Sequence, residues 1–441
     1  MSRADAALAA HRFGLGPAAG ELERIGNDPR GWLLAQLDMP AEPTPAFDPL
    51  PPASENVLDW WASVLISVSV LVRKIRTDYR DLWRREAEAR LRVAVTSEQP
   101  FRERLVAFWG SHFTCSGVKS VAIGMAGGHE REAVRPHVTG SFRDMLHDAV
   151  SHPAMLFYLD NYRSAGGNSM VAGYRRRGLN ENLAREVLEL HTLGVNGGYE
   201  QSDVTEFAKV LTGWTFGRAE SEAPGGFLFD AGLHEPGSKQ VLGETIDDAG
   251  EAEGRAVLDR LARHPATARH IADKLARHFV ADTPPPALVD RLAARFQETE
   301  GDLKELARTL VRSDEAWMPE RRKLKSPFEF AVGVHRALGL GEAERELFLA
   351  LISFGQAPFY APSPAGWPDH EAAWLNPDAA MRRVRFAHHA AWQAPGAPDP
   401  ASLAAACLDT LIPAADLAEC RAAGGRDGVA LLLASPAFQR R

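Results

Sequence analysis

Polar side chains are unusually dense in one predicted helix, at residues 180–193. Asn182, Glu186 and Glu189 are spaced i, i+4 and i+7, so at about 100° per residue an ideal helix places them on one narrow stripe. Two carboxylates about one turn apart can bind a divalent metal ion, or one can stay protonated as a general acid. The alternative is that arginines pair with the carboxylates and that the network only orders the core. The stripe therefore makes Glu186 and Glu189 candidate catalytic and metal-binding residues.

Other polar residues of this helix are candidates for supporting roles. Asn182 and Arg185 are predicted to orient the two carboxylates, and Asn180 and Asn182 to contact substrate. His191 is a further catalytic candidate, although a single histidine beside an apolar helix face is more often a core residue. An ideal helix separates Glu189 and His191 by about 160°, so the two do not share a metal ion unless the helix unwinds.

A second histidine, His112, follows a predicted helix at 98–109 and precedes Cys115 by three residues. Without a second pair of ligands, this His-x-x-Cys spacing is a weak signal for zinc. If His112 approaches the glutamate stripe from another helix, a histidine and two carboxylates form a site for metal-assisted hydrolysis or proton transfer. The alternative is that His112 only packs in the core.

The segment 355–375 is rich in proline and aromatic residues and is predicted to be mostly non-helical. Gln356, Trp367 and Trp374 are its candidate substrate-binding residues, because prolines lower the entropy lost on ordering and tryptophans offer a large contact area. A purely structural loop is the alternative.

One helix, at 267–280, carries His270, Lys274 and His278 at four-residue steps on one face. A protonated lysine between two histidines repels a metal ion, so we expect this face to be solvated.

Several motifs follow one another in order along nearly the whole chain. They are RFGLGP at 12–17, FWGSHF at 108–113, RPH at 135–137, HPAML at 152–156, YLDN at 158–161, NEN to GW at 180–214, KSPFE at 325–329, GQ at 355–356, PAGWP at 364–368 and WL at 374–375. Together they strongly resemble the bacterial family called domain of unknown function 1800. In that family the second motif often reads His-Asn-His-Phe, whereas here Gly110 and Ser111 precede His112, so only His112 matches a family histidine.

The resemblance also carries expectations about partners and location. Related genomes tend to place this family beside the domain of unknown function 1501 family, which resembles alkaline-phosphatase-like enzymes. We therefore expect either a hydrolase-type enzyme, with or without a metal ion, or a non-catalytic binding or export partner of such a neighbour. Many family members look exported, but no signal peptide is evident here, so we expect a cytoplasmic protein or one exported with a partner.

Composition is that of an ordinary globular protein. The 441 residues contain 45% hydrophobic and 24% charged residues, with a net charge of −8, which gives no electrostatic reason to bind nucleic acid. Three scattered cysteines do not define a disulfide framework or a cysteine zinc site. No stretch is long and apolar enough to predict a membrane span.

Apolar residues three and four apart predict a mainly α fold of many helices with irregular loops. The predicted helices are 6–11, 60–74, 79–94, 98–109, 142–152, 180–193, 203–212, 252–263, 267–280, 286–298, 302–312 and 327–338. Asp203 is the expected N-cap of its helix and Ser326 that of the last one. Residues 217–250, predicted as a linker or small hairpin, separate the halves 1–216 and 251–441, unless the chain forms one continuous domain.

Overall fold

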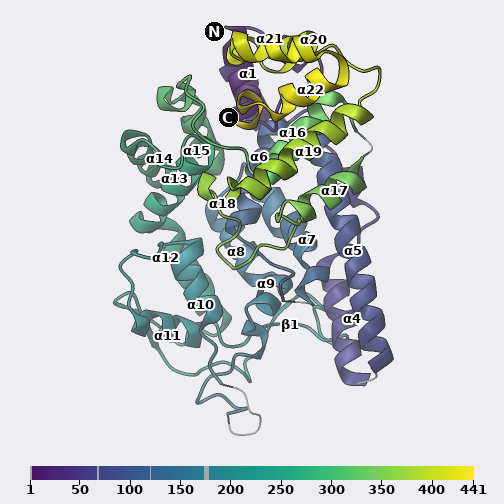
Figure 1. Cartoon of the computed structure of the whole chain (residues 1–441). Coiled ribbons are helices and arrows are strands. Elements are labelled where there is room, and N and C mark those ends of the chain that lie inside the picture. Colours follow the sequence, from purple (N-terminus) through teal and green to yellow (C-terminus); the bar gives the residue numbers. More distant parts are fainter. Residues whose placement is uncertain (1, 67–68, 120, 173–177, 342) are drawn as a thin grey trace.

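A computed structural model describes residues 2–66, 69–119, 121–172, 178–341 and 343–441 of the chain. Helices dominate it, which confirms the predicted mainly α fold (Figure 1). The helices of the first half are α1 (Arg3–Arg12), α2 (Glu21–Ile25), α3 (Pro29–Asp38), α4 (Ala53–Ile66), α5 (Ser69–Thr96), α6 (Pro100–His112), α7 (Ala126–His129), α8 (Phe142–Ser151), α9 (Pro153–Tyr158), α10 (Asn182–Glu186) and α11 (Gln201–Val210). Those of the second half are α12 (Glu251–Arg263), α13 (Pro265–Phe279), α14 (Pro286–Glu298), α15 (Leu303–Arg312), α16 (Pro327–Leu338), α17 (Glu344–Ser353), α18 (Glu371–Trp374), α19 (Pro377–Gln393), α20 (Pro400–Cys407), α21 (Ala414–Ala423), α22 (Gly425–Ala434) and α23 (Pro436–Gln439).

Short helical turns and strands complete the secondary structure. The 3₁₀ turns are η1 (Pro45–Phe47), η2 (Ala122–Gly124), η4 (Arg135–His137), η5 (Asn161–Arg163), η7 (Asp314–Trp317) and η8 (Asp409–Leu411), and the π-helical turns are η3 (Glu130–Val134) and η6 (Val187–His191). β1 (Trp214–Phe216) pairs antiparallel with β2 (Phe227–Phe229), with Trp214 opposite Phe229. β3 (Lys239–Val241) and β4 (Glu244–Ile246) form a second antiparallel pair.

Local capping explains why several helices begin where the sequence predicts. α14 and α16 start with a proline at the first turn, and the Ser326 hydroxyl accepts the Glu329 backbone N–H, as expected for the N-cap of α16. The predicted cap at Asp203 is wrong, because α11 begins earlier: Glu200 is its N-cap and Asp203 lies at the third helical position.

Two predicted helices differ from the observed ones in extent. α5 continues through the break expected between residues 74 and 79, and the helix predicted at 60–74 covers residues 67–68, which lie outside the described residues. The helix predicted at 180–193 is α-helical only over α10 and then widens into the π-helical turn η6. π-helical turns are rare and are frequent at functional sites.

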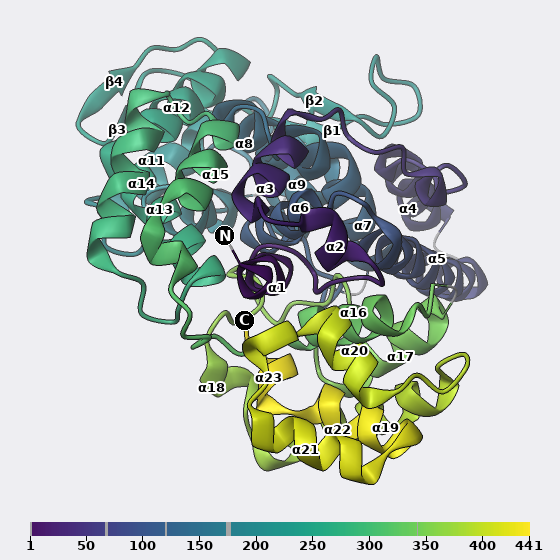
Figure 2. The same cartoon turned by 90° about the horizontal axis from the view of Figure 1, so that it is seen from above.

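Buried apolar side chains form one large core and smaller ones around it. The large core joins α3, α6, α8, α9 and α11 to α12–α15, while the C-terminal helices α19, α20 and α22 pack with α16 around a separate core. Seen from above, these C-terminal helices form one block beside α1, and α12–α15 form another (Figure 2). α6 lies between them, so side chains from both halves of the sequence meet at its C-terminal end (Figure 1).

None of the described helices combines the length and the apolar character needed to cross a membrane.

Candidate functional site

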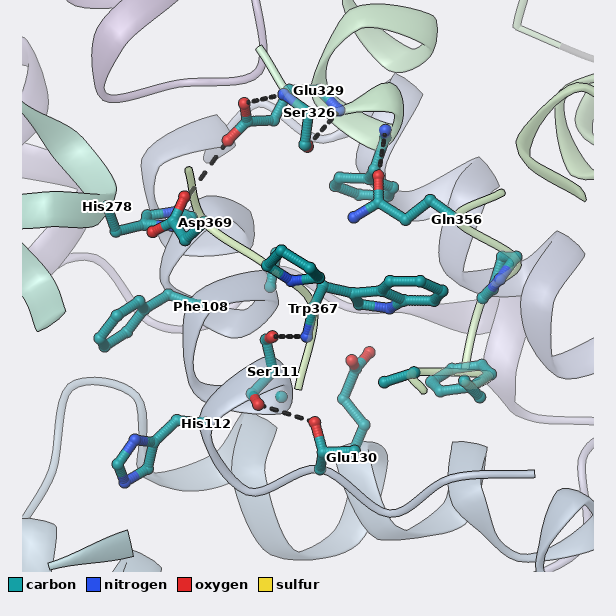
Figure 3. A pocket seen from close by; sticks show the side chains of 18 of the residues that line it. Phe108, Ser111, His112, Glu130, His278, Ser326, Glu329, Gln356, Trp367 and Asp369 are labelled. Atoms are coloured by element: carbon teal, nitrogen blue, oxygen red, sulfur yellow. Dashed lines mark hydrogen bonds and ion pairs between the residues drawn. The ribbon is translucent and has the colours of Figure 1, made fainter. Parts of the chain in front are cut away.

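A cavity of about 140 Å³ lies where α6, α13 and α16 meet the non-helical segment between α17 and α18. Its size is close to that of a cavity that holds one benzene molecule, so it suits a small compound or one group of a larger one. Aromatic and charged side chains line it together (Figure 3). The polar and aromatic lining residues are Arg90, Arg104, Phe108, Ser111, His112, Thr114, Cys115, His129, Glu130, Lys274, Arg277, His278, Ser326, Phe328, Glu329, Gln356, Phe359, Trp367 and Asp369.

A buried charge network forms one wall of this cavity. Glu329, on α16, pairs with Arg104 of α6 and accepts a hydrogen bond of 3.0 Å from Arg441 Nε. Burial alone would raise the pKa of the Glu329 carboxyl, but Arg104 and Arg441 lower it to about 2. His278 is fixed between two groups, because its Nε2 accepts from Arg104 Nε (2.9 Å) and its Nδ1 donates to Asp369 (3.0 Å). With both ring nitrogens engaged and every carboxylate paired, this wall acts as a rigid frame.

Lys274 differs from the other cations of the cavity. Its Nζ donates to His112 Nδ1 at 3.0 Å, and among the described residues no carboxylate oxygen lies within 4.0 Å of it. Arg90, Arg104 and Arg277, by contrast, all have carboxylate partners. Desolvation lowers the pKa of Lys274 from 10.5 to about 8, with Arg277 adding to the effect and Asp369 opposing it.

The hydrogen bonds of His112 define its tautomer. His112 is the last residue of α6, and its Nε2 lies 3.1 Å from the backbone oxygen of His191. A carbonyl oxygen only accepts, so Nε2 carries the proton and Nδ1 offers its lone pair to Lys274. Burial and the lysine charge lower the pKa of His112 well below its usual value, so the ring stays neutral. In this arrangement His112 has no free lone pair for a metal ion.

Glu130 places a second unusual titratable group in the same cavity. It is the first residue of the π-helical turn η3, and its carboxylate pairs with Arg90 at 2.8 Å. Burial raises the pKa of Glu130 above its usual value despite this arginine. Gly110 leaves room for it, because a Cβ at that position would lie 2.5 Å from Glu130 Oε2.

The aromatic segment is attached to α6 at the cavity. The backbone N–H of Trp367 donates to Ser111 Oγ at 3.1 Å, and the Ser111 hydroxyl and the Glu130 carboxylate both point towards Trp367 (Figure 3). Gly366 has φ +85°, and a Cβ there would lie 2.2 Å from the Ser111 backbone oxygen. Glycine is therefore required for this close approach.

Gln356 and Trp374, the other two residues predicted in this segment, have different places. Gln356 lines the cavity, and its Oε1 accepts the Phe328 backbone N–H at 2.7 Å, which anchors the segment to the start of α16. Trp374 lies behind the cavity wall, where its Nε1 donates to the Pro368 backbone oxygen and its ring packs near Trp367. Of the three, Gln356 and Trp367 reach the cavity.

The glutamate stripe is a separate feature. Glu186 and Glu189 are half-buried, neither forms an ion pair with a described residue, and neither is among the residues that line the cavity. Desolvation and the neighbouring Glu189 charge raise the pKa of Glu186, and Glu189 accepts the Tyr199 hydroxyl at 3.3 Å. The structure thus brings the two carboxylates together without bringing His112 to them, and a metal ion held by all three stays a prediction.

The remaining candidates of this helix have local partners. The Asn180 side chain donates to the backbone oxygens of Leu159 and Asp160, whereas Asn182 is exposed. Arg185 pairs with Glu181 at 2.9 Å rather than with the two predicted carboxylates. The predicted orienting role of Arg185 therefore has no contact to support it.

His191 is fully buried at the end of η6, and neither of its ring nitrogens has a hydrogen-bond partner among the described residues. Its ring lies 5.9 Å from that of His112, centroid to centroid. Desolvation lowers the pKa of His191 to about 3, so it is a neutral imidazole next to the Lys274–His112 pair.

In the described part of the chain, His234, Asp248 and Glu253 have the spacing of a metal site. Lys239 already occupies the cation position, because its Nζ lies 2.8 Å from Glu253 Oε2 and 3.1 Å from His234 Nε2. This cluster therefore fixes β3 to α12.

Two residues that line the cavity and have a shifted pKa, Lys274 and Glu130, were not predicted as site residues from the sequence. The face of α13 that carries Lys274 was expected to be solvated, and this is wrong: His278 and Lys274 line the cavity, and His270 donates to the Leu190 backbone oxygen. The four-residue spacing was the available signal. No sequence pattern indicated Glu130, because its inward position depends on a π-helical turn that α-helical spacing does not predict.

The chain belongs to the family described as "Protein of unknown function (DUF1800)", whose pattern matches residues 8–440. This confirms the family indicated by the motifs. No curated protein and no solved structure matches the chain.

Proposed function

We propose that this protein is an enzyme and that the cavity at the end of α6 is its active site. The observation that carries the proposal is Lys274: a half-buried amine that lines the cavity without a carboxylate partner among the described residues. An unpaired charge that is partly removed from water is unfavourable, so such a group is retained at a cost in stability. Glu130 faces the same cavity with a pKa shifted the other way. Acids and bases whose pKa values are shifted towards neutrality in this way are typical of acid–base catalysis.

The proposed reaction is hydrolysis of a small carbonyl compound. The neutral amine of Lys274 takes a proton from a water molecule, whose oxygen attacks the carbonyl carbon, and the Glu130 carboxyl gives a proton to the leaving group. Trp367 covers the bound compound, and the charge network around Glu329 keeps α6, α13 and α16 in register. Because Lys274 must be neutral and Glu130 protonated, the rate has a maximum between their two pKa values.

A pH-stat assay on small esters and amides tests this proposal. We expect hydrolysis of at least one of them, with a loss of about 100-fold or more in Lys274→Met and in Glu130→Gln. Lys304→Met is the matched control, because Lys304 pairs with Asp38 outside the cavity. Hydrolysis that survives Lys274→Met, or no hydrolysis of the panel by folded wild-type protein, would refute the proposal.

Metal dependence is tested separately at the glutamate stripe. Elemental analysis of purified protein and of a Glu186→Gln, Glu189→Gln double variant measures whether these carboxylates hold a metal ion. One metal per chain, lost in a folded double variant, would support the predicted metal site there.

The alternative function is a non-catalytic partner of an alkaline-phosphatase-like neighbour. Its support is an exposed apolar stripe on α19, where Met381, Val384 and Trp392 are 51%, 43% and 51% exposed. Exposed apolar side chains that share a face are typical of protein–protein contacts. A pull-down with the neighbour, compared between wild type, Lys274→Met and Trp392→Glu, separates the two functions. A partner function predicts binding that only Trp392→Glu abolishes.

A further inference from the structure

The lysine of the cavity is one of two that share the same unusual surroundings. Lys325 donates to His11 Nδ1 at 2.9 Å, and His11 Nε2 lies 3.0 Å from the Cys407 backbone oxygen. Lys274 repeats this order of amine, imidazole and carbonyl through His112. Neither lysine has a carboxylate within 4.0 Å among the described residues.

The two lysines differ in what their amines can reach. Lys325 is 1% exposed and is absent from the lining of the cavity, with its Nζ over the Phe438 ring. Lys274 lines the cavity. The chain thus contains an internal control: the Lys325 amine is buried in the core, whereas the similar Lys274 amine is accessible to a ligand in the cavity.

His112 gives the Lys274 amine a proton acceptor in a fixed position. The carbonyl of His191 keeps the proton on Nε2, so Nδ1 stays available at 3.0 Å from the amine. An amine that bonds to carbon must lose a proton, and an adjacent neutral imidazole accepts it without rearrangement.

We infer that Lys274 is a covalent nucleophile that forms an imine with the carbonyl carbon of a small aldehyde or 2-oxo acid. The inference rests on the proposed active site and adds a second reaction there, in which Lys274 bonds to a carbonyl carbon that carries no leaving group. The cavity of about 140 Å³ suits a reacting group of a few non-hydrogen atoms. Arg277, on the same helix, also lines the cavity, but it pairs with Asp273, so the lining gives no preference between the two substrate classes.

The reaction balances with groups of the cavity alone. The Nζ lone pair bonds to the carbonyl carbon while the carbonyl oxygen takes a proton from Glu130, and the nitrogen then gives a proton to His112 Nδ1. That proton passes to the departing hydroxyl, the C–O bond breaks and water leaves, so that a C=N bond remains. The iminium nitrogen returns the last proton to Glu130, and neither an oxidant nor a reductant takes part.

Reductive trapping tests the inference directly. The full-length protein is incubated with glyoxylate and cyanoborohydride at pH 7, and labelled lysines are located by peptide mass mapping. With a pKa of about 8, Lys274 holds about 250-fold more neutral amine at pH 7 than an ordinary lysine. We therefore expect it to react on the order of 100-fold faster than Lys304, with Lys325 unlabelled.

Three variants keep the outcome interpretable. Lys274→Arg should remove the label from α13 and leave Lys304 unchanged, and His112→Gln should slow labelling of Lys274 while the chain stays folded by circular dichroism. Labelling of Lys274 no faster than that of Lys304, or equal labelling of Lys325, would overturn the inference. If trapping fails while Lys274→Met still abolishes hydrolysis, Lys274 is a general base and only the imine is refuted.

Discussion

Replacing Glu329 by glutamine removes one negative charge from the wall of the cavity and keeps the shape of the side chain. Arg104 and Arg441 would then be buried without their counter-charge. The fall in the Glu329 pKa from 4.5 to about 2 corresponds to about 3 kcal/mol of folding free energy at neutral pH. Breaking a buried ion pair typically costs about 3–5 kcal/mol, which agrees with this value.

The size of the chain converts this free energy into a melting temperature. Unfolding entropy of about 2.1 cal/mol/K per residue gives about 0.9 kcal/mol/K for 441 residues. Glu329→Gln should therefore lower Tm by about 3–4 °C at pH 7 if the chain unfolds as one unit. Thermal melts followed by circular dichroism measure this, with Asp290→Asn as the control, because Asp290 and its partner Arg269 are exposed and should contribute less than about 1 kcal/mol.

The stabilisation that Glu329 contributes depends on pH. Because folding lowers the pKa of Glu329, its stabilisation is complete above the unfolded value of 4.5 and is lost as the pH falls towards about 2. The difference in stability between wild type and Glu329→Gln should therefore narrow by about 1 kcal/mol between pH 7 and pH 3.5. A variant as stable as wild type at pH 7, or a difference that widens in acid, would refute the reasoning.

Three further substitutions test individual contacts. Gly366→Ala forces a Cβ against the Ser111 backbone oxygen and should destabilise the fold by about 1–3 kcal/mol, with a change in tryptophan fluorescence; unchanged fluorescence and Tm would contradict the close approach. Lys239→Met removes the lysine that pairs with the buried Glu253 and should lower the free energy of unfolding, measured in urea, by about 3–5 kcal/mol. Adding Glu253→Gln should recover most of this loss, whereas no recovery would show that the two residues are not coupled. Ser326→Ala removes the N-cap of α16 and should lower stability by about 1 kcal/mol in the same assay, whereas no change would mean that the cap is unimportant.

Local signals in the sequence account for most of the helices. α14 and α16 were predicted with their observed ends because proline starts both of them and a serine caps α16. The cap of α11 was misplaced because Glu200 and Asp203 both suit a helix start, and the third residue of a capping box resembles the first.

The site was only partly predictable because its parts come from distant segments. Residue type alone indicated His112, Gln356 and Trp367, and all three lie around the cavity. The inward face of α13 was not predictable, because spacing defines which residues share a face but not which neighbour covers it. Lys274 is half-buried because α6 and the Trp367 segment line the same cavity, and these segments are far apart in the sequence.

The pKa of Lys274 is the measurement that tests the account most directly. NMR titration of the chain with ¹³C-labelled lysine follows the Cε resonances of eight lysines, and Lys274→Arg identifies the relevant one. A desolvated amine without a carboxylate partner predicts a midpoint of about 8. A midpoint at or above the ordinary value of 10.5 would mean that water or a carboxylate reaches the amine, and it would contradict both the proposed catalytic role and the imine.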